Sequence, residues 1–203
     1  RVMPKIAILL SGRGTNMVAL ARRVASGDLD ADIRFVGSDR PDAEGLARAE
    51  ALSLPTLMLP YREKGKDEAE ELLLGYLDKN GVEWVVLAGF MRILSPRVVS
   101  RFRDRIANIH PALLPAFPGT GAIESAWNYG VKVTGVTVHL VDEEMDHGPI
   151  LAQRCVPIDE GQTLEELEER IHEVEHDIYW RTLKDLFAGR YKKEGRRMKL
   201  DRT

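Results

Sequence analysis

The amino-acid sequence predicts an α/β protein in which a doubly wound, mostly parallel β-sheet carries helices on both faces. Short apolar runs alternate with helical stretches along the first half of the chain. Each run is apolar at successive positions, as expected of strands that are buried on both faces of a parallel sheet. The 203 residues contain no internal repeat, no low-complexity tract and no Gly/Ser linker, which favours a single domain.

The first half contains five strand patterns that alternate with helical patterns. The predicted strands are residues 5–10, 33–36, 56–59, 84–88 and 106–109, and the predicted helices are residues 16–25, 45–52 and 66–80. Ser11-Gly12 ends the first strand, and two prolines bound the third. Asn80-Gly81 ends the amphipathic helix 66–80 with a C-cap signal.

The second half is richer in β-branched residues. It predicts strands at 133–141 and 150–156, separated by a polar loop at 142–149. A long, highly charged helix follows at 164–187. We therefore assign residues 1–190 to one domain and residues 191–203 to a basic C-terminal tail, which we expect to be partly disordered.

Composition excludes several classes of protein. The net charge of −3 gives no general electrostatic reason to expect nucleic acid or an anionic membrane as a partner. No apolar run approaches the ~20 residues that cross a bilayer, and no signal peptide precedes the first strand. The single cysteine, Cys155, excludes an internal disulfide and a multi-cysteine zinc site. We expect a cytoplasmic globular protein.

A glycine-rich turn, Ser11-Gly12-Arg13-Gly14-Thr15-Asn16, follows the first predicted strand and opens the first predicted helix. Glycines permit a tight turn there, and the free N–H groups of a helix N-terminus attract a phosphate. Met17 stands at the third glycine position of a G-x-G-x-x-G motif, so the turn favours one phosphate over a pyrophosphate. The alternative is an ordinary strand-to-helix turn with Thr15 or Asn16 as N-cap.

A second candidate site lies at the end of the predicted strand 106–109, where Asn108 and His110 precede a proline-rich loop. Ligands of doubly wound sheets bind beyond the carboxyl ends of strands. A histidine beside an amide side chain can serve there as an acid/base group next to an oxyanion donor. If the fold brings Asp146 to His110, the carboxylate would stabilise the imidazolium. The alternatives, a structural histidine and a solvated turn at Asp146, stay open on spacing alone.

The segment His172-Glu173-Val174-Glu175-His176 fits the H-E-x-x-H pattern of zinc metalloproteases. Both histidines would share one face of the predicted helix 164–187, as zinc binding requires. The sequence offers no clear third ligand, although Glu194 lies within reach along the chain, and no neighbouring sheet edge to seat a peptide. We therefore expect no metal site.

Five segments, taken in order, resemble the phosphoribosylglycinamide formyltransferases of purine synthesis, over about residues 5–187. The segments are Ser11-Gly12-Arg13-Gly14-Thr15-Asn16, Leu87-Ala88-Gly89-Phe90-Met91-Arg92-Ile93-Leu94-Ser95-Pro96, Asn108-Ile109-His110-Pro111-Ala112-Leu113-Leu114-Pro115, Gly135-Val136-Thr137-Val138-His139 and Asp146-His147-Gly148-Pro149-Ile150. The resemblance implies a Rossmann-like domain with a mixed sheet. It also implies transfer of a formyl group from the co-substrate 10-formyltetrahydrofolate to the amine of glycinamide ribonucleotide, without a metal.

The resemblance also implies roles for individual residues. Asn108, His110 and Asp146 would be the catalytic trio, and the loop 141–146 would close over the pterin. The ribonucleotide would be held by Gly14, Thr15 and Asn16 at its phosphate and by Glu175 at its ribose. The implied folate-binding residues are Lys66, Met91, Arg92, Ile93, Leu94, Asn108 and Val141. By this match, the H-E-x-x-H pattern is a coincidence around a substrate ligand.

Two positions depart from the family pattern. Gly121 stands where the family usually has a histidine, and Lys66 stands where many members have an arginine near the folate tail. The first bears on substrate contacts, and neither belongs to the trio.

Other enzymes of the superfamily are the alternatives. A formyltetrahydrofolate deformylase would carry an N-terminal regulatory domain and a second histidine where Pro111 stands, and a methionyl-tRNA formyltransferase would carry a C-terminal tRNA-binding barrel. We expect neither extra domain, because the chain begins with its first core strand and has about 200 residues. A nucleotide-binding module without catalysis is the alternative of a different class. We expect small-molecule substrates, no nucleic acid or membrane partner, and a monomer or homodimer.

Overall fold

The computed structural model describes residues 3–202 and divides the chain into two compact units, residues 1–107 and 108–203. The boundary falls inside strand β5 (Ile106–His110), so one strand contributes residues to both units. Residues 1, 2 and 203 are the outer ends of the predicted domain and tail, and they lie outside the described residues. No helix within 3–202 is long and apolar enough to cross a membrane.

The first unit alternates strands and helices as the sequence predicts. Its strands are β1 (Lys5–Leu10), β2 (Asp32–Ser38), β3 (Thr56–Met58) and β4 (Trp84–Leu87), and its helices are α1 (Thr15–Ser26), α2 (Glu44–Ala51), α3 (Tyr61–Lys64), α4 (Lys66–Lys79) and α5 (Pro96–Arg101). All neighbouring strands here pair in parallel, in the order β3-β2-β1-β4-β5. In β1, residues 6–10 are fully buried, which explains why this strand is apolar at successive positions.

The order of the strands in this unit explains why both faces of its sheet carry helices. β1, β2 and β3 step in one direction, and β4 then returns to the other side of β1. Crossovers between parallel strands are right-handed, so this reversal places α1 and α2 on one face and α4 on the other. Consistent with this, α1 contacts α2, and the short α3 contacts α4.

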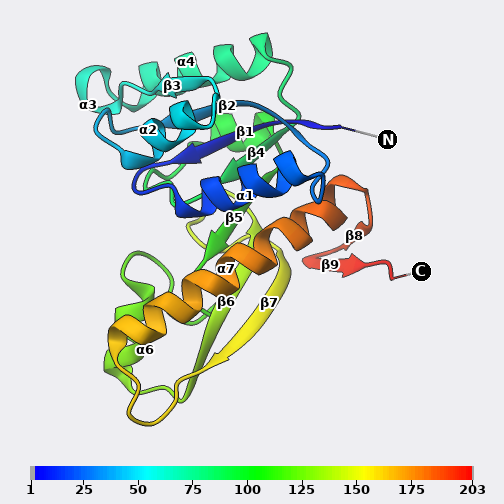
Figure 1. The fold of residues 1–203 in the computed structure, drawn as a ribbon. Helices are drawn as coiled ribbons and strands as arrows, with labels where there is room; N and C mark the ends of the chain where they lie inside the picture. The colour runs from blue at the N-terminus through cyan, green and yellow to red at the C-terminus, as the bar shows by residue number, and fades with distance from the viewer. Residues whose placement is uncertain (1–2, 203) are drawn as a thin grey trace. The chain divides into compact units, whose positions relative to one another are not determined.

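The second unit is built around an antiparallel pair of strands. It contains α6 (Ala122–Tyr129), β6 (Val133–Leu140), β7 (Ile150–Pro157), α7 (Leu164–Phe187), β8 (Tyr191–Glu194) and β9 (Arg197–Leu200). β6 pairs with β7 from Val133↔Pro157 to His139↔Ile150. The long helix α7 contacts both strands (Figure 1). It begins with a capping box between Thr163 and Glu166.

The full strand order, β3-β2-β1-β4-β5-β6-β7, is that of a mixed, mostly parallel sheet, which confirms the predicted Rossmann-like class. The predicted helix 164–187 agrees with α7 at both ends, and the other predicted elements agree to within a few residues.

Two features of the fold differ from the sequence prediction. The short helices α3, α5 and α6 were not predicted, because four to eight residues contain too few turns for an apolar period to emerge. The expectation of partial disorder in the tail does not hold for residues 191–200, which form the antiparallel hairpin β8–β9. Its strands are largely exposed and basic, so burial left no pattern in the sequence.

Candidate active site

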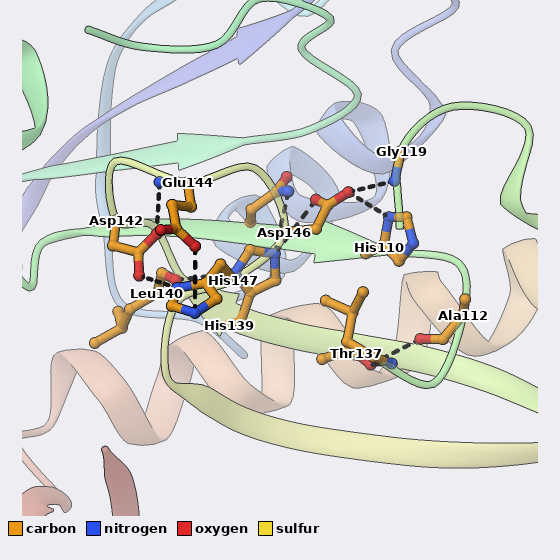
Figure 2. Close-up of polar contacts among 12 residues, drawn as sticks. His110, Ala112, Gly119, Thr137, His139, Leu140, Asp142, Glu144, Asp146 and His147 are labelled. Atoms are coloured by element: carbon orange, nitrogen blue, oxygen red, sulfur yellow. Dashed lines mark hydrogen bonds and ion pairs between the residues drawn. The ribbon is translucent and has the colours of Figure 1, made fainter. Parts of the chain in front are cut away.

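Two side chains that are distant in sequence, His110 and Asp146, meet in the second unit (Figure 2). Asn108 and His110 are two residues apart at the carboxyl end of β5, so both point to the same side of the strand. Asp146 lies in the loop between β6 and β7. Asp146 Oδ2 lies 3.6 Å from His110 Nδ1, and both side chains are about nine-tenths buried, at 10% and 6% exposure. The spacing in the sequence left open whether His110 and Asp146 lie close together, and the structure shows that they do.

Both ring nitrogens of His110 face hydrogen-bond acceptors. Its Nε2 lies 2.7 Å from the carbonyl oxygen of Phe117. A carbonyl oxygen only accepts hydrogen bonds, so Nε2 carries a hydrogen. Nδ1 faces the Asp146 carboxylate, which also only accepts when ionised. The Phe117 carbonyl oxygen thus fixes the orientation of the His110 ring and directs Nδ1 toward Asp146.

The loop after β5 holds both members of this pair. Phe117 offers its carbonyl oxygen to His110, and the Gly119 N–H donates to Asp146 Oδ2 at 2.7 Å. Phe117 and Asp146 both have left-handed backbone conformations, with φ of 49° and 52°. Such conformations cost free energy in residues other than glycine and persist only where the surroundings enforce them. The pair is thus held by backbone groups in a fixed frame.

Thr137 on β6 anchors the start of the same loop. Its hydroxyl donates to the carbonyl oxygen of Ala112 at 2.7 Å and accepts from the Leu114 N–H at 3.1 Å. Gln153 on β7 donates to both Thr137 Oγ1 and the Leu114 carbonyl oxygen at 3.0 Å. The Leu114–Pro115 peptide bond is cis. These contacts fix the path of the chain from β5 toward Phe117.

A second buried histidine, His139 on β6, sets the orientation of Asn108. His139 Nδ1 lies 2.9 Å from the carbonyl oxygen of Leu140, so Nδ1 carries a hydrogen. Burial lowers the pKa of His139, an effect that outweighs the opposing influence of the Leu140 carbonyl and of Asp146. The ring is therefore neutral at pH 7, and Nε2 presents a lone pair.

The neutral ring accepts a hydrogen bond from Asn108. Asn108 Nδ2 lies 3.3 Å from His139 Nε2, so the amide group turns its NH₂ rather than its oxygen toward the histidine. An amide nitrogen carries two hydrogens, and this contact uses one. The other remains available to a ligand oxygen.

Sequence reasoning missed the residues that support the trio. His139 and Thr137 were quoted for the family resemblance without a role, although these polar residues alternate with apolar ones at the end of β6. That alternation is the signal that could have found them. Phe117 and Gly119 act through backbone atoms, which no side-chain pattern reveals.

In the first unit, the predicted phosphate turn packs tightly against the start of α2. Gly14 is the N-cap of α1 with φ of 76°, and an added Cβ there would lie 2.6 Å from Gly45 Cα. The Gly45 N–H donates to the Gly12 carbonyl oxygen at 3.0 Å. Gly14 has no side chain to cap the helix, so Thr15 or Asn16 as N-cap is not observed. Within residues 3–202, the buried Oδ1 of Asn16 has no hydrogen-bond partner.

Four of the residues implied in folate binding, 91–94, follow β4 and are joined to this turn. Ser11 Oγ accepts from the Met91 N–H at 2.8 Å and donates to Asp39 Oδ1 at 2.5 Å. Arg92 Nε donates to the other oxygen of Asp39 at 2.9 Å, and Asp39 is almost fully buried. Neither Ser11 nor Asp39 was assigned a role from the sequence. Their hydrogen bonds tie the Met91 segment to the glycine turn.

The four implied folate residues of this segment differ in what they expose. Met91 and Ile93 are 54% and 52% exposed, an unusual state for large apolar side chains. Leu94 is buried, and the Arg92 head group is engaged by Asp39. Met91 and Ile93 therefore offer apolar side chains to a ligand, whereas Arg92 and Leu94 offer mainly backbone atoms.

Lys66, the first residue of α4, is exposed. Glu70 lies one turn further along α4 and accepts from the Ser95 N–H at 2.8 Å. Residues four apart share a helix face, so Lys66 lies on the face of α4 that contacts the end of the Met91 segment. This position fits the implied role of Lys66 near a bound folate.

Three remaining positions lie in the second unit. Val141 is the first residue after β6 and is partly exposed, and Gly121 is the N-cap of α6 with φ of 67°. Glu175 on α7 is 6% exposed and accepts from His172 Nδ1 at 2.7 Å. Among the residues that the structure describes, no group of three or more His, Cys, Asp or Glu side chains could hold a metal ion.

Comparison with known proteins identifies the class to which this fold and site belong. The model of the formyl transferase family matches residues 4–183, and the chain belongs to that family. A phosphoribosylglycinamide formyltransferase of Bacillus subtilis is 42% identical over 187 residues, which are 92% of this chain and 96% of the relative. One of Haemophilus influenzae is 39% identical over 93% of this chain and 89% of the relative.

A solved structure extends the comparison to three dimensions. The crystal structure of glycinamide ribonucleotide transformylase 1 from Symbiobacterium toebii matches with a TM-score of 0.93 and 41% sequence identity. The match covers 98% of this chain and 94% of the other.

Proposed function

We propose that this chain transfers the formyl group of 10-formyltetrahydrofolate to the primary amine of glycinamide ribonucleotide, a step of purine biosynthesis. Family membership and the named relatives support this reaction. The observation that carries the assignment to residues is the meeting of His110 and Asp146 at 3.6 Å, beside an Asn108 that keeps an amide hydrogen free. Formyl transfer needs these three groups: an oxyanion donor, an acid and a base.

The reaction begins when the neutral amine of glycinamide ribonucleotide attacks the formyl carbon. A new C–N bond forms, and the carbonyl electrons move to the oxygen to give a tetrahedral oxyanion. The free hydrogen of Asn108 Nδ2 donates to this oxygen. A donor fixed in place before the reaction lowers the barrier by roughly 3–4 kcal/mol, and His139 provides that fixation from the other side of the amide.

Collapse of the intermediate breaks the bond between the formyl carbon and N10. The His110 imidazolium gives its Nδ1 proton to N10, so tetrahydrofolate leaves as a neutral amine. The Nδ1–Oδ2 separation of 3.6 Å is longer than a hydrogen bond, so the proton is not locked to the carboxylate. Asp146 takes the proton of the attacking nitrogen and passes it to His110, which restores the starting state.

The remaining residues would hold the two substrates. We assign the ribonucleotide phosphate to the N–H groups at Gly14, Thr15 and Asn16, since an uncapped helix N-terminus suits one phosphate. We assign its ribose to Glu175, whose carboxylate His172 orients. The folate-binding residues proposed here are Lys66, Met91, Arg92, Ile93, Leu94, Asn108 and Val141.

The physiological setting is also a proposal. We expect an enzyme of the cytoplasm that works on small-molecule substrates as a monomer or homodimer. A single cysteine, which forms no disulfide within the chain, fits a reducing compartment.

Acceptor dependence tests the proposed function. Purified protein is incubated with 10-formyltetrahydrofolate in the presence and absence of glycinamide ribonucleotide, and tetrahydrofolate is measured. We expect turnover only with the ribonucleotide. Release of formate without the ribonucleotide would indicate a deformylase, and binding of the ribonucleotide without turnover would indicate a catalytically inactive binding module.

A further inference from the structure

The β8–β9 hairpin contacts the rest of the second unit at its base and at its tip. It begins at Tyr191, beyond the residues 4–183 that the family model matches, and the mechanism above gives it no role. Figure 1 shows the hairpin in red beside the C-terminal end of α7. β9 also contacts β7, the strand that follows the Asp146 loop.

Arg190 closes the base of the hairpin. Its Nη1 donates to the Asp185 carboxylate on α7 at 2.7 Å. Its Nε and Nη2 donate to the carbonyl oxygen of Asp201 at 3.1 and 2.8 Å, and the Asp201 N–H donates to the carbonyl oxygen of Arg190 at 2.8 Å. One guanidinium thereby joins the end of α7 to both ends of the hairpin.

Tyr191, the first residue of β8, joins the base of the hairpin to β7. Its hydroxyl donates to the carbonyl oxygen of Leu151 at 3.1 Å. Burial, followed by the nearby Asp185 carboxylate, raises the pKa of Tyr191 to about 12. The hydroxyl therefore keeps its proton, and this contact persists throughout the pH range in which proteins are assayed.

The tip of the hairpin reaches the loop that carries Asp146. Arg196, in the turn between β8 and β9, donates through Nη2 to the carbonyl oxygen of His147. The His147 ring is held within the loop, with Nδ1 2.7 Å from Asp142 Oδ2 and Nε2 3.4 Å from Glu144 Oε2 (Figure 2). His147 directly follows Asp146 and is thus held at its side chain by the loop and at its backbone by the hairpin.

The conformation of Asp146 explains why such support matters. Its φ of 52° is one that residues other than glycine rarely adopt without external constraint. The carbonyl of His147 belongs to the peptide unit that follows the Asp146–His147 peptide. A hydrogen bond from Arg196 therefore restricts rotation of the backbone one residue beyond the strained position.

The residues on either side of His147 close the loop through other contacts, whereas the carbonyl oxygen of His147 accepts from Arg196. The Leu140 N–H donates to the Pro149 carbonyl oxygen at 2.8 Å, and a Cβ added at Gly148 would overlap the carbonyl of Leu140. These contacts fix where the loop starts and ends. Between those points, the Gly119 N–H holds the Asp146 side chain, and the contacts of His147 hold the residue that follows it.

We propose that Arg196, in the turn of the C-terminal hairpin, is a positioning residue, which acts through the backbone of His147 to hold the Asp146 carboxylate against His110. The proposal rests on the proposed function, because it assumes that Asp146 takes part in the reaction. It assigns a role to a segment outside the matched family domain.

The test is steady-state formyl transfer by Arg196→Ala, with Arg197→Ala as the matched control. Arg197 is the next residue of the same hairpin, has the same charge and is exposed. A displacement of about 1 Å at a catalytic group costs up to about 10²-fold in rate. We expect kcat to fall about tenfold for Arg196→Ala, with KM for both substrates and the melting temperature nearly unchanged. Arg196→Lys should recover part of the loss, and Arg197→Ala should match the wild type.

A double-variant cycle separates positioning from a general structural effect. If Arg196 acts through Asp146, Arg196→Ala should have almost no further effect on kcat in an Asp146→Asn background. Equal fold losses in both backgrounds would overturn the proposal, as would wild-type kcat in Arg196→Ala. Absence of formyl transfer by the wild-type protein would instead refute the proposed function, so the two failures are distinguishable.

Discussion

Asp146 Oδ2 lies 3.6 Å from His110 Nδ1, although His110 ends strand β5 and Asp146 lies in the loop between β6 and β7. Neither residue reaches this position through its own element alone. Gly119 donates to Asp146 and Phe117 accepts from His110, so the proline-rich loop between them sets the distance. An imidazole and a carboxylate held in this way form an acid/base pair at the carboxyl end of a central strand.

Replacing the carboxylate tests the pair directly. Asp146→Asn keeps the shape of the side chain, and asparagine tolerates a left-handed backbone, so folding should be nearly unchanged. Loss of the base should lower kcat by about 10²-fold or more, the size of a single acid/base contribution. The measurement is kcat together with the melting temperature, with the exposed Asp159→Asn as a charge-matched control. Near-wild-type kcat would remove Asp146 from the mechanism.

The depressed pKa of His139 predicts how stability depends on pH. The folded chain resists protonation of His139, whereas the unfolded chain binds that proton near the ordinary pKa of 6.5. Between the two pKa values the unfolded chain holds more protons, so the free energy of unfolding falls as the pH drops below about 6.5. His176, whose pKa burial also lowers, contributes with the same sign.

Chemical denaturation at several pH values between 8 and 5 measures this effect. His139→Gln removes the titrating group, so its free energy of unfolding should fall less steeply below pH 6.5 than that of the wild type. The same comparison above pH 7 is the internal control, because His139 is neutral there in both states. Identical slopes for the two proteins below pH 6.5 would show that His139 is not held neutral by the fold.

The glycine turn allows a matched pair of substitutions. Gly14→Ala introduces a Cβ within 2.6 Å of Gly45 Cα at a φ of 76°, whereas Gly12→Ala meets no atom within 4 Å. Strain of this kind costs about 1–3 kcal/mol. We expect Gly14→Ala to lower the free energy of unfolding by that amount and to raise KM for the ribonucleotide. Urea titration should find Gly12→Ala close to the wild type, and equal losses would contradict the packing described for this turn.

The H-E-x-x-H segment predicts an outcome that separates two enzyme classes. His172 Nδ1 makes a hydrogen bond to the Glu175 carboxylate. The histidine therefore orients a carboxylate and does not point to a metal site. We expect formyl transfer by the wild type, His172→Ala and His176→Ala to be unaffected by EDTA. Metal analysis of the purified proteins is the second measurement. One zinc per chain that is lost on either substitution would favour a metalloprotease.

Much of the fold could be predicted from the sequence because burial leaves a pattern. The strand at residues 6–10 is apolar throughout because it lies between β2 and β4. Helix α7 was predicted to the residue, because it is long enough to show its period and begins with a capping box. The hairpin β8–β9 left no such pattern, since its contacts are made by single arginine and tyrosine side chains.

The candidate active site could also be predicted only in part from the sequence. Residues that act by chemistry, such as His110 and Asp146, could be named from the motifs and the family resemblance. Residues that act by orientation could not. The Leu140 carbonyl fixes the tautomer of His139, and that tautomer fixes the orientation of the Asn108 amide. Gly119 contributes only its backbone N–H. Those relationships depend on distances that appear once the chain is folded.

The central claim is that this site moves a formyl group from a folate to an amine. The most direct measurement follows isotopically labelled formyl from 10-formyltetrahydrofolate in a single turnover with glycinamide ribonucleotide. We predict that nearly all of the label enters the formylated ribonucleotide, and that Asp146→Asn forms the same product at a much lower rate. Label recovered mainly as formate, or retained on the folate with both substrates bound, would contradict the account.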